Sequence, residues 1–61
     1  MNTLMPEVSA WYQELATGNL FEVVAIDEAS GSIEYQLLDG EVEEYDSASW
    51  QMLYLAPAEA P

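Results

Sequence analysis

The sequence predicts a mainly β fold, a small antiparallel barrel or meander of three to five strands with one short helical turn. Two observations lead to this prediction. Residues 20–45 contain three strand-like runs rich in β-branched and aromatic residues, separated by turn residues, and a capped helical turn follows them. A chain of 61 residues has room for one domain. We expect residues 1–55 to form that domain and residues 56–61 to be a flexible tail.

The first predicted hairpin spans residues 20–38. Its first strand is the run LFEVVAI at 20–26, and DEASG at 27–31 forms the loop, with Gly31 available for a positive φ. Residues 32–38 then alternate between apolar and polar side chains, as a half-buried strand does. The alternation predicts that Ile33 and Tyr35 face the core.

A second hairpin is predicted at the Asp-Gly dipeptide of residues 39–40. Two residues of this type between strand-like runs favour a tight turn, which would pair Leu38 with Glu41. In that register Tyr35 lies opposite Glu44, and a glutamate is an awkward partner for a buried ring. We therefore expect a β-bulge near Glu43 or Glu44, or the edge of the core there.

The segment before the first hairpin has two interpretations. The run WYQEL at residues 11–15 favours a first strand, and ATGN at 16–19 favours the turn after it. Residues 6–15 also satisfy a helical spacing, so a helix that begins near Pro6 is the alternative.

The segment after the second hairpin predicts a helical turn and a last strand. Asp46 or Ser47 offers an oxygen that would cap a single turn over residues 46–52, with Trp50 closing one end of the core. Residues 53–55 would add a short strand.

The charge of the chain is strongly one-sided. It has twelve Asp and Glu, no Lys, Arg or His, and a formal net charge of −12. Yet 51% of the residues are hydrophobic, which is too apolar for a disordered acidic tail. Such a field repels nucleic acid and anionic membranes and attracts basic protein surfaces. We expect a basic protein surface as partner, with no direct nucleic-acid or membrane contact; the oligomeric state stays open.

The same composition argues against catalysis. Without Cys, His, Lys or Arg, the chain lacks thiolate nucleophiles, imidazole bases and cationic groups that stabilise an oxyanion. We expect no catalytic residue and no cofactor. The acids at 27–28 do not have the ligand spacing of an EF-hand, so we expect no metal site. A signal peptide and a long apolar span are also missing from the pattern, which favours the cytoplasm.

Two groups of side chains are candidate binding sites. The first is an acidic face that neighbouring strands would present to a partner, although solubility alone would also explain it. The second is a candidate aromatic pocket for a cationic side chain, although rings in so small a domain usually pack in the core. The acidic face consists of Glu22, Glu34, Glu41, Glu43, Glu44 and Asp46, and the aromatic pocket of Trp11, Tyr12, Tyr35 and Tyr45.

The chain also carries two resemblances. Short antiparallel strands that end in a one-turn helix resemble an SH3-like or Tudor-like barrel. The chain also resembles a family of short acidic bacterial proteins of unknown function. The motifs that carry this resemblance are the Trp-Tyr at 11–12, FEVVAID at 21–27, the Ser-Gly link, the run IEYQ at 33–36, the Asp-Gly turn and Trp50. That resemblance covers residues 11–50 and implies a folded, natural protein, but it brings no activity or ligand with it.

Three functions follow from these observations. The first is a non-enzymatic acidic protein that docks on a basic surface of a larger assembly, with nucleic-acid machinery as the favoured owner because its channels are lined with Lys and Arg. The second is a Tudor-like module that takes a cationic side chain into its aromatic pocket. The third is a structural protein that associates with itself through an exposed edge strand.

Overall fold

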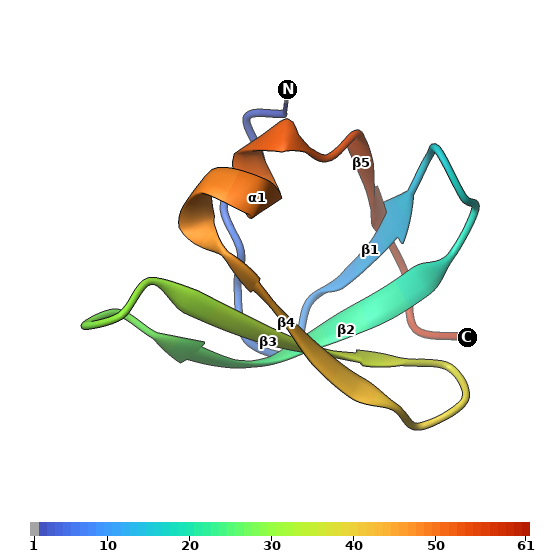
Figure 1. Ribbon diagram of the computed structural model, residues 1–61. Coiled ribbons are helices and arrows are strands. Elements are labelled where there is room, and N and C mark those ends of the chain that lie inside the picture. Colours follow the sequence, from blue (N-terminus) through green and yellow to red (C-terminus); the bar gives the residue numbers. More distant parts are fainter. Residues whose placement is uncertain (1) are drawn as a thin grey trace.

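The computed structural model describes residues 2–61 and shows one antiparallel sheet that curls around a small core (Figure 1). Within these residues it contains five strands and one short helix, which confirms the predicted mainly β class. The strand order across the sheet is β4-β3-β2-β1-β5, so β4 and β5 form its two edges. The elements are β1 (Trp11–Glu14), β2 (Leu20–Asp27), β3 (Ser32–Leu37), β4 (Val42–Asp46), α1 (Ser47–Met52) and β5 (Leu55–Ala58).

The β2–β3 hairpin forms where the sequence predicts it. Asp27 pairs with Ser32, and the amide of Gly31 donates to the Asp27 carbonyl at 2.8 Å. Gly31 has φ 76°, a conformation in which a side chain would be strained. The Asp27 carboxylate accepts the amide of Ala29 at 3.0 Å, so the loop is closed by its own residues.

The β3–β4 hairpin corrects the predicted register. Leu37 donates to the Glu41 carbonyl at 2.8 Å, and the loop between them has three residues, 38–40, instead of two. The predicted pairing of Leu38 with Glu41 is therefore wrong. Gly40 ends the loop with φ 93°, the conformation that three-residue hairpins need at this position. The bulge lies in β2, between Val23 and Ala25, and not near Glu43 or Glu44 as expected.

The extra loop residue places Glu43, and not Glu44, opposite Tyr35. A carboxylate is tolerated beside this ring because β4 is an edge strand and Glu43 is exposed to solvent. The edge of the core therefore does lie at Glu43 and Glu44, as the second of the two alternatives predicted.

The first strand is confirmed, while the last strand is longer and later than expected. β1 covers Trp11–Glu14 and lies between β2 and β5 in the sheet. β5 begins at Leu55, and its four residues pair with β1 through Ala58. The prediction of a flexible tail from residue 56 is thus wrong for residues 56–58, because their backbone completes the second side of β1.

The first residues described form an N-terminal strap (residues 2–6) that crosses the open side of the sheet. Asn2 holds one end of it: its side-chain amide donates to the carbonyls of Trp50 at 2.8 Å and Leu53 at 2.9 Å, at the end of α1. The Trp50 indole in turn donates to the Leu4 carbonyl at 2.8 Å. The Tyr12 hydroxyl donates to the Met5 carbonyl at 3.0 Å.

The core is dominated by aromatic rings between the sheet, α1 and the strap. Trp50 meets Tyr12 edge-on with ring centroids 5.1 Å apart, and Phe21 lies 5.0 Å from Tyr35. Aromatic pairs at such centroid distances, and the edge-to-face pair of Trp50 and Tyr12 in particular, stabilise beyond the area they bury. The buried core residues are Tyr12, Phe21, Val23, Ile33, Tyr35, Trp50 and Leu55.

Candidate functional site

The side of the sheet that faces away from the core carries most of the predicted acidic face. Successive side chains of a strand point to opposite faces, and directly paired residues of antiparallel strands share a face. Phe21, Ile33 and Tyr35 point into the core, so their strand neighbours Glu22 and Glu34 point outward. We call this side of β1–β4 the outer face.

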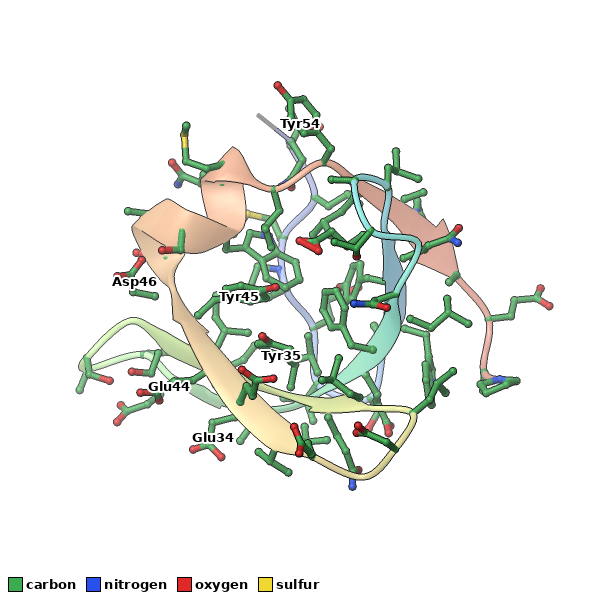
Figure 2. The ribbon with its side chains drawn as sticks, turned by 45° about the vertical axis from the view of Figure 1, so that its right-hand side comes forward. Glu34, Tyr35, Glu44, Tyr45, Asp46 and Tyr54 are labelled. Carbon is green, nitrogen blue, oxygen red and sulfur yellow. The ribbon has the colours of Figure 1, made fainter. Side chains whose placement is uncertain are left out.

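Two rows of acids cross the outer face. Glu34 pairs directly with Glu44, and Figure 2 shows both on the outside of the β3–β4 pair. In the next row Asp27 and Asp46 flank Ser32 from both sides. Of the predicted acidic residues, the outer face thus unites Glu22, Glu34, Glu44 and Asp46, and it adds Asp27, which the sequence placed only in a loop.

Two predicted members of the acidic face lie elsewhere. Glu43 pairs with Tyr35, so it projects toward the core side of β4. Glu41 lies in the hairpin before β4, on the same side of the strand as Glu43 by alternation. The prediction that both belong to the acidic face is therefore wrong, because the observed register turns Glu43 toward the side of Tyr35.

The outer face is electrostatically frustrated. Glu34 and Glu44 stand directly opposite each other, and like charges in such a pair are destabilising. The sequence contains no Lys, Arg or His that would offset them. Asp46 differs from the other acids because it caps α1: its carboxylate accepts the Ser49 amide at 2.7 Å, and this hydrogen bond lowers the pKa of Asp46.

The structure does not bring the four predicted pocket rings together. Trp11 pairs with Glu22 and Ala58 and lies on the outer face, while Tyr12 is buried on the other side of β1. Tyr35 is buried and stacks on Tyr45 at a centroid distance of 4.4 Å, which leaves no space for a cation between these rings. Figure 2 shows the two tyrosines inside the curled sheet. Tyr12 and Tyr35 are therefore part of the core, and the half-buried Tyr45 packs against it.

Trp11 instead adds an aromatic surface to the outer face. Its row continues through Glu22 and Gln36 to Val42, which is 54% exposed. The outer face thus combines acids with an indole and an aliphatic side chain.

A second feature, which sequence reasoning missed, is a groove of about 320 Å³ between the N-terminal strap, the β2–β3 hairpin and the start of α1. We call it the strap groove. Leu4, Met5 and Pro6 form one wall, Ile33 and Trp50 contribute to its lining, and Asp27 and Glu28 lie at the hairpin side. No local signal predicts it, because the strap and the hairpin are distant in the sequence.

Within residues 2–61, no three acidic side chains are arranged so that they would hold a common metal ion. The single helix described, α1, has six residues, and no helix in this part of the chain has the length and apolar composition needed to cross a membrane.

These elements define a small antiparallel β protein with an acidic outer face and an apolar groove beside the N-terminal strap. The chain belongs to a family of unknown function (DUF6763), whose model matches residues 1–61. The resemblance to an uncharacterised family, which was carried by residues 11–50, is thereby confirmed over the whole chain. Neither the curated proteins nor the solved structures gave a match.

Proposed function

We propose that this chain is a non-enzymatic binding module that docks through its outer face on a basic surface of a larger protein assembly. The observation that carries the proposal is the direct pairing of Glu34 with Glu44 in a chain without a basic side chain. Such a pair destabilises the free protein, whereas a Lys or Arg of a partner placed over it would remove the repulsion.

The composition of the outer face supports this mode of binding. Twelve carboxylates would steer a basic partner toward the molecule and raise the association rate at low salt. Trp11 and Val42 lie on the same face and offer apolar contact once the partner has arrived. Nucleic-acid machinery is the favoured owner of the basic surface, since proteins that neutralise phosphates display Lys and Arg.

The strand order also supports a comparison with SH3-like barrels. A meander in which β1 lies between β2 and β5, with a helical turn between β4 and β5, resembles that fold. Folds of this size host many binding functions, so the comparison adds to the binding proposal without naming a ligand.

A capture experiment with charge-matched variants tests the proposal. Tagged protein is incubated with lysate of its native source at low and high salt, as wild type, as Glu34→Gln/Glu44→Gln, and as Glu7→Gln/Glu59→Gln. Both double variants remove two charges, but only the first pair lies on the outer face. Because the chain has no Lys or Arg, trypsin yields peptides of captured partners with no internal bait peptide.

We expect a basic partner that is lost at high salt and lost with Glu34→Gln/Glu44→Gln, but retained by the control. Equal loss with both variants would show that net charge alone governs capture and would refute the outer face as the docking site. Recovery of the bait alone would overturn the proposal and favour self-association through the free edge of β4.

A further inference from the structure

The strap groove is the second candidate binding surface of the molecule. Its lining includes the edges of two core residues, Ile33 and Trp50, which are 3% and 2% exposed. Its outer wall includes Met5, which is 76% exposed. A groove of about 320 Å³ is at the small end of ligand sites, so it fits one bulky side chain better than a folded element.

The wall of the groove is fixed in place. The Trp50 indole holds the Leu4 carbonyl at 2.8 Å, and the Tyr12 hydroxyl holds the Met5 carbonyl at 3.0 Å. The groove is therefore already formed in the unbound protein, and binding would not have to order the strap first.

Carboxylates border the apolar surface on its hairpin side. Asp27 and Glu28 line the groove, and the Asp27 carboxylate is oriented by the amides of Ala29 and Ser30 at 3.0 and 3.4 Å. Asp46 lies across Ser32 from Asp27, so the acids of the outer face continue to the groove.

We propose that the strap groove binds a short basic segment of the partner protein, with one large apolar side chain in the groove and a flanking Lys or Arg on Glu28 and Asp27. This inference rests on the proposed docking function and names the chemistry of the partner. Charge complementarity selects this occupant, since a second copy of the chain would bring only carboxylates and no basic side chain to this acidic border.

The test uses two synthetic peptides of alternating lysine and serine, one with a central leucine and one with serine at that position. Each is titrated into isotopically labelled protein at low salt, and the amide and indole resonances are followed by NMR. We expect the leucine peptide to shift the Trp50 indole and the Gly31 and Ser47 amides, and to bind about tenfold more tightly than the serine peptide, since leucine burial contributes that much affinity.

Matched variants separate groove binding from general charge. Met5→Glu places a carboxylate in the apolar wall, and Leu38→Glu makes the same change in the distant β3–β4 loop at 59% exposure. We expect Met5→Glu to remove the advantage of the leucine peptide and Leu38→Glu to preserve it. Glu28→Gln should weaken the leucine peptide severalfold, while Glu59→Gln should have little effect.

The outcomes distinguish this inference from the proposed function. Equal binding of both peptides, with shifts confined to the outer face around Glu34 and Glu44, would overturn the groove and leave outer-face docking in place. Groove binding of the leucine peptide that is unchanged in Glu34→Gln/Glu44→Gln would support the groove, and loss of partner capture by the same double variant would separately support the outer face. Changes in chemical shift that occur without peptide as the protein concentration rises, and that are absent in Met5→Glu, would show that a second copy of the chain occupies the groove. That result would overturn the basic-segment proposal.

Discussion

Replacement of Trp50 by phenylalanine should weaken the fold by about 2 kcal/mol. The indole donates to the Leu4 carbonyl, and its loss leaves a half-buried acceptor without that partner, at a cost of roughly 1 kcal/mol. The smaller ring leaves a void in a core where Trp50 is 2% exposed, which adds roughly 1 kcal/mol. A domain of 61 residues is expected to have a total of about 3–9 kcal/mol, so the loss is a large share of it.

Urea unfolding followed by far-ultraviolet circular dichroism measures this change at fixed salt. With an m value of about 1 kcal/mol/M for so small a chain, the midpoint of Trp50→Phe should fall by about 2 M. The matched control is Trp11→Phe, because Trp11 is half-buried on the outer face and its replacement should cost under about 1 kcal/mol. A loss below about 0.5 kcal/mol for Trp50→Phe, or an equal loss for both variants, would refute this account of the strap and the core.

Three further predictions concern charge. Glu44→Gln should stabilise the protein by about 0.2–1 kcal/mol in low salt, because it removes the repulsion with Glu34. The gain should shrink as salt rises, and the absence of any gain in urea unfolding would contradict the pairing of these two residues. The hydrogen bond from the Ser49 amide lowers the pKa of Asp46 in the folded protein. The ionised cap therefore stabilises the fold above the ordinary pKa of 3.8, and this contribution is lost as pH falls through the folded-state pKa. The difference in free energy of unfolding between wild type and Asp46→Ala should therefore become smaller in acid. Burial against the core, beside the stacked Tyr35 ring, raises the pKa of Tyr45 above its ordinary 10.0. Unfolded chains therefore ionise first, and stability falls as pH rises past about 10. Tyr45→Phe should lose less stability than wild type over this range, and equal sensitivity of the two proteins would contradict the burial of this hydroxyl.

The sequence predicts those parts of the fold that are determined by neighbouring residues. The loop at residues 27–31 closes on the Asp27 carboxylate and a positive-φ glycine, and the helix begins at the Asp46 cap; both signals act within a few residues. The alternation of Ile33 and Tyr35 likewise gives the buried face of β3 without knowledge of its partner strands.

The features that sequence reasoning missed depend on distant contacts. An Asp-Gly pair is compatible with a two-residue or a three-residue loop, and the register that places Glu43 beside Tyr35 is set by packing across the whole hairpin. The backbone of β5 pairs with β1, some forty residues earlier in the chain, and composition at residues 55–58 does not reveal this. The strap groove needs Asn2 and Trp50 to meet, which no local pattern indicates.

The positions of the acids on β4 bear on whether copies of this chain associate with one another. β4 is an edge strand that pairs only with β3, and exposed edges of this kind invite pairing between copies. Glu43 and Glu44 lie on opposite faces of that edge, so a second copy would bring like charges to both sides. A basic segment would meet attraction on the same faces. Under the proposed docking, the repulsion that weakens the free molecule would also be the source of its selectivity, because a partner that brings the cations this sequence lacks would relieve it.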